Sequence, residues 1–513
     1  MQKIARTGLL AGGMLLAATS AGQAANLVWA RDGDIDSLDP HRATSTLSRQ
    51  FWYQIYDSLL EFDENGAPVA NLAKAWTVSP DGKQVVFELN DGIKCHDGTA
   101  FDADDVKWTI DRALGDKNPS LTKASWGPIT AVTKVDRLNV KIDLSEPFGA
   151  FIPFLADQFT SMLCDSNKDA ENFGVSSAVG TGPWKFVSWV KGSEIVLARN
   201  EDYTRYGRPV DNAGAPYVDS LTIITMPEGQ TRMAGLRTGE LHIVVPPIEE
   251  VEDIQKDDSI DLFLAQNSGQ NMFLEFSFNR PPFNDARARK AIAHAIDFEA
   301  ALDIVFGGLV ERELCPVSQG VFGNSQEFCA AHGQDYDPDK AMALLKELGY
   351  GPDNPLPVTL MTWTGDSREK LLQVFQNMLK QVGVKAGIEV MDIGTLNARV
   401  KTENNKQDGP GTIDLMGWTW FDPDVLYLLW RSPGAYEGYT QPDLDVLLDT
   451  TRTAVTEEER MTAVRGTIAH LLENAVHVPV YTPGWLWMYA VTDKAPGFKI
   501  GPFNRPLFND VKL

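Results

Sequence analysis

Residues 71–106, NLAKAWTVSPDGKQVVFELNDGIKCHDGTAFDADDV, decide the fold because turn, strand and helix signals follow one another there in a fixed order. Ser79-Pro80-Asp81-Gly82 is a turn sequence, and Val85 to Leu89 alternates as a half-buried strand does. Asp102 then precedes a helical pattern as a candidate N-cap, and two further acids follow in the first turn, where exposed backbone N–H groups favour negative charge. The stretch therefore predicts a strand, a turn and a helix in succession.

The rest of the chain alternates strand-like and helical segments, as an α/β fold requires. Residues 26–30 read as a short strand. Apolar periodicity and stop signals predict helices over residues 45–60, 287–296, 338–348 and 367–382. Thr456 with Glu459 forms a capping box before another helix. We therefore expect an α/β protein without internal repeats.

Length and composition indicate a globular protein with several cores. At 513 residues the chain exceeds the size of one ordinary core and predicts two or three domains. Hydrophobic residues make up 43% of the chain, and 24 Phe with 13 Trp supply apolar area for those cores. The formal net charge of −24 argues against nucleic acid as a partner, because phosphate backbones would be repelled.

The N-terminal segment has the order of a secretory signal peptide. Lys3 and Arg6 form a basic region, residues 8–18 are apolar, and residues 21–24 offer small side chains to signal peptidase. We expect cleavage after Ala24. No later segment approaches the roughly 18 uncharged residues of a membrane helix, so we expect no membrane insertion. With no cysteine near the cleavage site to carry a lipid, these features predict a protein of the Gram-negative periplasm.

Four cysteines in an exported chain are candidates for disulfides, and four allow three pairings. Cys315 and Cys329 flank a segment with turn formers and with neither a helical nor a strand period. We expect these two residues to pair and to hold the segment as a loop. Cys95 and Cys164 then either pair with each other or remain buried free thiols, and both alternatives stay open.

The motifs of common enzymes and cofactor sites are missing from the sequence. It contains no GxSxG elbow, no Walker phosphate loop, no GxGxxG after a strand, and no HExxH or CxxC motif. No two of the seven histidines stand at the i, i+4 spacing that puts two metal ligands on one helical face. We therefore expect no enzymatic activity, no cofactor and no metal.

A cluster of aromatic residues indicates ligand recognition instead. Residues 416–424, MGWTWFDPD, place three aromatic rings ahead of a helix-like run. Trp418 and Trp420 stand two apart and would share one face of a strand. Their flat rings beside the carboxylate of Asp422 suit a small ligand with an amine or polar end, although such rings are as often only part of a core.

Several segments resemble, in order along the chain, the family 5 extracytoplasmic solute-binding proteins, which are the dipeptide, oligopeptide and nickel receptors of ABC importers. They are residues 37–41 (SLDPH), 71–106, 144–147 (LSEP), 180–184 (GTGPW) and 236–240 (LRTGE). The resemblance implies a two-lobed periplasmic-binding-protein fold of type II with an additional accessory domain.

The same resemblance implies the domain bounds. The first lobe takes residues 26–55, 178–265 and 479–513, the accessory domain 56–177, and the second lobe 266–478. The chain would then cross between the lobes only near residues 265 and 479, which is compatible with hinge bending around a cleft.

The resemblance also implies a ligand site. In the family a cleft Trp is followed a few residues later by an Asp that meets the amino terminus of a peptide. Gly417-Trp418 matches the start of that motif, but Phe421 takes the expected acid position and the carboxylate arrives one place later, at Asp422. Asp422 either reaches the amine after a shift in the turn or is displaced from it.

Four further residues complete the predicted site. Trp363 lies where a strand gives way to a loop, which in open α/β sheets faces the ligand crevice. Met272 lies near the start of the second lobe, and Ser45 and Thr46 are polar groups of the facing lobe.

We therefore expect a periplasmic receptor that encloses a small solute between two lobes and delivers it to the permease of an ABC importer. A peptide or peptide-like amine is the leading ligand class, followed by an opine or a sugar, with nickel last because histidines are few. We expect a monomer. The alternatives from other classes are a secreted hydrolase and a non-transporting sensor or chaperone subunit with the same fold.

Overall fold

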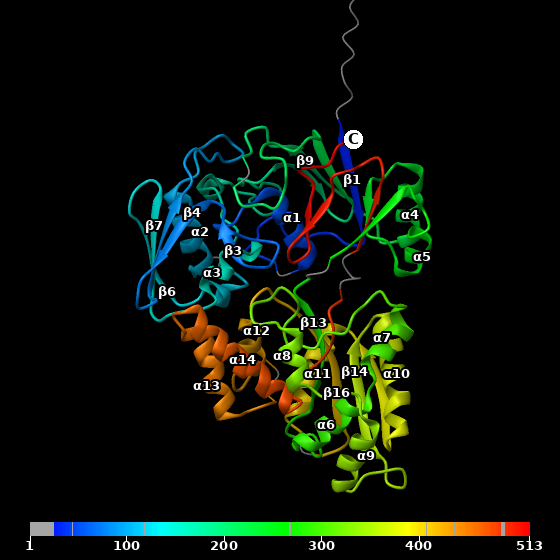
Figure 1. Ribbon diagram of the computed structural model, residues 1–513. Helices are drawn as coiled ribbons and strands as arrows, with labels where there is room; N and C mark the ends of the chain where they lie inside the picture. The colour runs from blue at the N-terminus through cyan, green and yellow to red at the C-terminus, as the bar shows by residue number, and fades with distance from the viewer. Residues whose placement is uncertain are drawn as a thin grey trace, which may run out of the picture.

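The computed structural model describes residues 25–513 except 44, 117–119, 205, 266–267, 407, 436–437 and 484–487, so the predicted signal peptide lies outside it. The chain forms three main sheets with helices packed around them, a mixed α/β architecture as predicted. Figure 1 shows the largest sheet in the upper half, a second body below it, and a third at the side.

The first sheet has seven strands and gathers segments from distant parts of the chain. Its order is β12 (Ile260–Leu264), β18 (Met488–Thr492), β11 (Ile243–Val244), β1 (Asn26–Arg31), β10 (Ser220–Thr225), β9 (Glu194–Arg199) and β8 (Trp184–Val190). The predicted strand at residues 26–30 is thus present, and its alternation buries Leu27 and Trp29 completely. We call the body around this sheet the first lobe.

The second sheet has five strands, and we call the body around it the second lobe. Its order is β15 (Val384–Met391), β14 (Leu356–Trp363), β16 (Gly411–Thr419), β13 (Gln270–Phe276) and β17 (Val478–Tyr481). Because β17 pairs with β13 up to Tyr481, this strand lies with the second lobe, a few residues past the predicted bound of 478. The other domain bounds stay a prediction.

The third sheet contains the diagnostic stretch of sequence, and we call the body around it the accessory domain. Its order is β4 (Ala73–Val78), β5 (Gln84–Leu89), β7 (Asn139–Leu144) and β6 (Ile129–Lys134). The turn at residues 79–82 joins β4 to β5, as predicted. Asp102 caps α2 (Ala103–Leu114) in a capping box with Asp105. Two short pairs, β2 (Leu60–Phe62) with β3 (Pro68–Ala70) and β19 (Lys499–Gly501) with β20 (Arg505–Leu507), complete the strands of the described residues.

The helices agree with the predicted ranges to within a few residues. The prediction at 45–60 is too long, because α1 ends at Ile55, where the Ile55 carbonyl accepts a hydrogen bond from Gly182 N at 3.1 Å. Thr456 and Glu459 form the predicted capping box of α14. Besides α2, the α-helices of the described residues are α1 (Thr46–Ile55), α3 (Phe151–Phe154), α4 (Gly229–Thr238), α5 (Val251–Ile254), α6 (Ala286–Ala295), α7 (Phe298–Phe306), α8 (Gln326–His332), α9 (Pro338–Glu347), α10 (Asp366–Gln381), α11 (Ile393–Asn404), α12 (Asp424–Trp430), α13 (Pro442–Thr453) and α14 (Glu457–Glu473).

Both cysteine pairs are bridged. Cys315 and Cys329 are disulfide-bonded with their Cα atoms 5.2 Å apart, as predicted. Cys95 and Cys164, which the sequence left open, also form a disulfide, with Cα atoms 6.2 Å apart, and it ties the loop after β5 to the segment before residue 165. Among the residues that the structure describes, none of the helices combines the length and apolar character needed to cross a bilayer.

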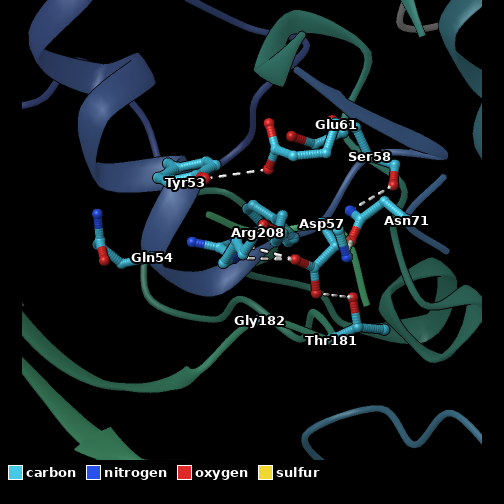
Figure 2. Close-up of polar contacts among 12 residues, drawn as sticks. Tyr53, Gln54, Asp57, Ser58, Glu61, Asn71, Thr181, Gly182 and Arg208 are labelled. Atoms are coloured by element: carbon cyan, nitrogen blue, oxygen red, sulfur yellow. Dashed lines mark hydrogen bonds and ion pairs between the residues drawn. The ribbon is translucent and has the colours of Figure 1, made fainter. Parts of the chain in front are cut away.

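A buried network of charges joins the first lobe to the accessory domain. Arg208 donates to Asp57 at 3.0 Å, and the second carboxylate oxygen of Asp57 accepts from Thr181 at 2.9 Å (Figure 2). Tyr53, from α1, donates to Glu61 at 3.0 Å. The network continues through Arg505, which pairs with Glu61 and lies 3.6 Å from Asp157, and through Arg49, 3.5 Å from Asp157. Three cations thus balance three carboxylates, and all six side chains are buried.

Candidate functional site

One edge of the second sheet collects most of the predicted site residues. β14 and β16 run parallel, so their carboxyl ends, Trp363 and Thr419, meet at this edge. β13 runs antiparallel to β16 and begins there, with Gln270 opposite Thr419. Both links between the two large sheets, from β12 to β13 and from β17 to β18, also leave from this edge. It therefore lies next to the first lobe, in the position where open α/β sheets bind ligands.

Gly417 brings Met272 and Trp363 together at this edge. A Cβ atom at Gly417 would collide with the sulfur of Met272 and would lie 3.1 Å from the ring of Trp363 and 3.3 Å from the amide of Gln270. Met272 is buried, and Trp363 is half-buried. The two residues were predicted separately, from different strands, and the absence of a side chain at Gly417 allows them to pack closely.

Trp418 and Trp420 lie on the same side of the chain, as their spacing predicts. Trp418 lies opposite Asn271, one residue before the end of β16, and Trp420 donates its backbone N–H to Gly269 O at 2.8 Å, which continues the pairing. Both rings line one small internal cavity of about 10 Å³ together with Val425. The ring of Trp420 also meets Phe154 of the accessory domain edge to face, with centroids 6.0 Å apart. In this conformation Trp420 therefore contacts protein across the domain boundary.

Asp422 is engaged within the second lobe. It is 1% exposed, and its Oδ1 accepts from Arg460 Nη2 at 2.6 Å and from the backbone N–H of Asp424 at 2.8 Å. These bonds fix the start of α12 and join it to α14. A carboxylate already paired with an arginine is a weak anchor for a ligand amine, because the pair would have to be broken first.

A groove of about 640 Å³ passes this ion pair and separates the second lobe from the accessory domain. Phe421, Asp422 and Arg460 line it from the second lobe, and Trp76 and Ile152 line it from the accessory domain. The aromatic motif thus borders a space that lies between domains.

Ser45 and Thr46 lie at the start of α1 in the first lobe. The Ser45 hydroxyl caps this helix by accepting a hydrogen bond from Ser48 N at 3.2 Å. Both side chains are half-buried. The structure therefore gives Ser45 a capping role, and ligand contact by either residue stays a prediction.

The sequence analysis missed Arg368, the cation of this edge. Its guanidinium lies 4.2 Å from the centre of the Trp363 ring and donates to the backbone carbonyls of Trp363 and Thr364. Burial lowers the pKa of Arg368, and within the described part of the chain only the Tyr481 hydroxyl, and no carboxylate, offsets that effect. A basic residue in the first turn of a helix opposes the helix dipole, and this was the available sequence signal.

Comparisons with known proteins show the family to which this chain belongs. The family model of bacterial extracellular solute-binding proteins, family 5, matches residues 67–438. The glutathione-binding protein GsiB of Pectobacterium atrosepticum is 32% identical over 410 residues, which cover 77% of this chain and 76% of that protein. GsiB of Escherichia coli strain K12 is 32% identical over 412 residues, covering 79% and 77% of the two chains.

A solved structure shares the fold over almost the whole chain. The ABC transporter substrate-binding protein CtaP from Listeria monocytogenes superimposes with a TM-score of 0.82 at 21% identity, covering 96% of this chain and 99% of that one. On the family match and the extent of the relatives, the chain belongs to the bacterial extracellular solute-binding proteins of family 5.

Proposed function

We propose that this protein is the periplasmic receptor of an ABC importer and that it captures a peptide-like solute carrying at least one carboxylate. The observation that carries the ligand class is Arg368, a guanidinium without a carboxylate partner among the described residues, placed over Trp363 at the edge of the second sheet. Its Nε and Nη2 each donate to a backbone carbonyl, so a ligand carboxylate would bind at the Nη1 side of the guanidinium, where two parallel hydrogen bonds from Nη1 and Nη2 can form.

The relatives support this ligand class. Proteins 32% identical to this chain are named as glutathione-binding, and glutathione is a tripeptide with two carboxylates. Trp363 and Trp418 offer flat surfaces for the apolar part of such a ligand. Closure of the two lobes would surround it, and only a ligand that contacts both lobes favours the closed state.

The ligand prediction is tested with reduced glutathione by calorimetry. Arg368→Gln should weaken binding at least tenfold, since a charge-assisted hydrogen bond contributes about 1.5–3 kcal/mol. Trp418→Ala should cost about 1–3 kcal/mol, as for truncation of a buried aromatic contact. Both variants should keep their melting temperature in the unliganded state to within a few degrees.

Asp422→Asn separates this proposal from amine anchoring. Because Asp422 pairs with Arg460, its substitution should lower the melting temperature of the protein and leave the affinity for the ligand nearly unchanged. The opposite result, lost binding with unchanged stability, would assign the ligand amine to Asp422. If Arg368→Gln keeps its affinity, the proposal of a ligand with a carboxylate is wrong, and an uncharged, sugar-like solute is favoured.

Export is tested by mass spectrometry of protein recovered from the periplasm. Intact mass should correspond to a chain that begins at Ala25 or within a residue or two.

Non-reducing peptide maps should recover Cys95 linked to Cys164 and Cys315 linked to Cys329. Free thiols at either pair would contradict the disulfide pairing, and a retained Met1 in the exported protein would contradict cleavage of the signal peptide.

A further inference from the structure

The accessory domain contacts the second lobe directly at three glycines, each in a loop. Gly66 lies between β2 and β3, Gly82 between β4 and β5, and Gly149 between β7 and α3. Figure 1 shows the partner elements α13 and α14, in orange, directly below β6, β7 and α3.

Gly149 fits against the second lobe with no space for a side chain. Its backbone N–H donates to Arg452 O at 2.6 Å. A Cβ atom at this position would lie 2.7 Å from Thr451 O and 2.8 Å from Arg460 Nε. A backbone carbonyl cannot move aside as a flexible side chain does, so any residue larger than glycine would push the two domains apart.

The neighbouring residues extend this contact. The guanidinium of Arg452 lies 5.4 Å from the ring centre of Phe148 and is held in place by Asp424 at 2.6 Å. Arg460, on the other side of Gly149, carries the ion pair with Asp422. Asp422 and Arg460 thus line the groove between the domains together with Gly149, and all four charged side chains belong to the second lobe.

Gly66 makes the second close contact, with the loop closed by the Cys315–Cys329 disulfide. A Cβ atom at Gly66 would collide with the carbonyl oxygen of Gly320 in that loop. The disulfide therefore holds a surface against which the accessory domain rests.

We propose that the accessory domain is the latch of lobe closure, with Gly149 and Gly66 as its two seating points on the second lobe. The domain is fixed to the first lobe by the buried ion network around Asp57, so seating it on the second lobe holds the two lobes together. The latch changes the balance between open and closed forms without touching the solute. This inference rests on the lobe closure of the proposed function, but its decisive measurement needs no ligand.

The test compares the radius of gyration of ligand-free variants by small-angle X-ray scattering. Gly149→Ala should shift the population towards the open, larger form. Its matched control is Gly351→Ala, which makes the same backbone change with no atom within 4 Å of the new Cβ. Gly66→Ala, at φ 79°, is matched by Gly92→Ala, at φ 82° in the same domain with free space around it.

Ligand affinity gives a second readout. The apparent affinity should fall by the same factor as the closed fraction, because only the closed form binds the solute fully. Arg368→Gln should instead weaken binding with the radius of gyration of the ligand-free protein unchanged.

Three outcomes would overturn the latch. The first is that Gly149→Ala and Gly66→Ala match their controls in radius of gyration. The second is that neither variant folds, which would make these contacts a requirement for folding and not a contact that forms on closure. The third is a wild-type radius of gyration that is the same with and without any bound solute. If no tested peptide binds, the proposed ligand class fails, while the ligand-free comparison still decides the latch.

Discussion

Replacing Arg208 with Met should lower the free energy of unfolding by about 3–5 kcal/mol, the usual cost of removing one partner from a buried ion pair. Arg208 and Asp57 are 2% and 4% exposed, so the carboxylate left behind would be cut off from water. Among the residues that the structure describes, only the hydroxyl of Thr181 would remain to bind it through a side chain. The guanidinium also lies 3.8 Å from the ring centre of Tyr53, and that contact would be lost as well.

Urea unfolding followed by tryptophan fluorescence measures this effect. Lys94→Met is the matched control, because the Lys94–Asp202 pair is about half exposed and should contribute no more than about 1 kcal/mol. Combining Arg208→Met with Asp57→Asn should recover part of the loss, since no charge then remains unpaired. A loss below about 1 kcal/mol for Arg208→Met alone would show that water reaches Asp57 after the substitution.

Glu275→Gln should stabilise the protein at neutral pH and leave it unchanged near pH 4. Glu275 and Asp414 occupy directly opposed positions on β13 and β16, and both are buried. Neither carboxylate oxygen of Glu275 has a hydrogen-bond partner in the described part of the chain. Burial, and then the charge of Asp414, raises the pKa of Glu275 well above its ordinary value.

The surrounding charges do not neutralise this pair. Burial, followed by the charge of Glu403 on α11, raises the pKa of Asp414, and a hydrogen bond with Thr412 and the charges of Arg280 and Arg399 oppose that effect. Both arginines, however, contact Glu403, at 2.5 and 2.7 Å. The folded protein therefore keeps protons on Glu275 and Asp414 at a pH where the unfolded chain has released them.

The sign of the pH dependence follows from this difference. Because the folded state binds more protons, the free energy of unfolding falls as pH rises above about 4, by up to about 1.4 kcal/mol per pH unit for each group. Glu275→Gln removes one such contribution, so its stability should fall less steeply between pH 4 and pH 7. The exposed Glu240→Gln serves as control. Equal slopes for Glu275→Gln and wild type would mean that Glu275 is ionised in the folded protein.

The sequence alone determined the local elements and the fold class. Asp102 caps its helix and Thr456 forms a capping box with Glu459, as predicted, because each hydrogen bond joins residues within one turn of chain. The Cys315–Cys329 pairing was predictable because only 14 positions separate the two residues. Cys95 and Cys164 are 69 positions apart, and their pairing depends on how the accessory domain packs α2 and its loops around them.

The site divides in the same way. The spacing of Trp418 and Trp420 placed both rings on one side of the chain, because strand geometry repeats every two residues. The partner of Asp422 lies 38 residues further along, and no local pattern connects the two. Tertiary structure alone decided that Arg460 binds this carboxylate and that Gly149 rests on Thr451. Each of these contacts joins elements brought together only when the sheets and helices pack, and their energy depends on the burial that packing creates.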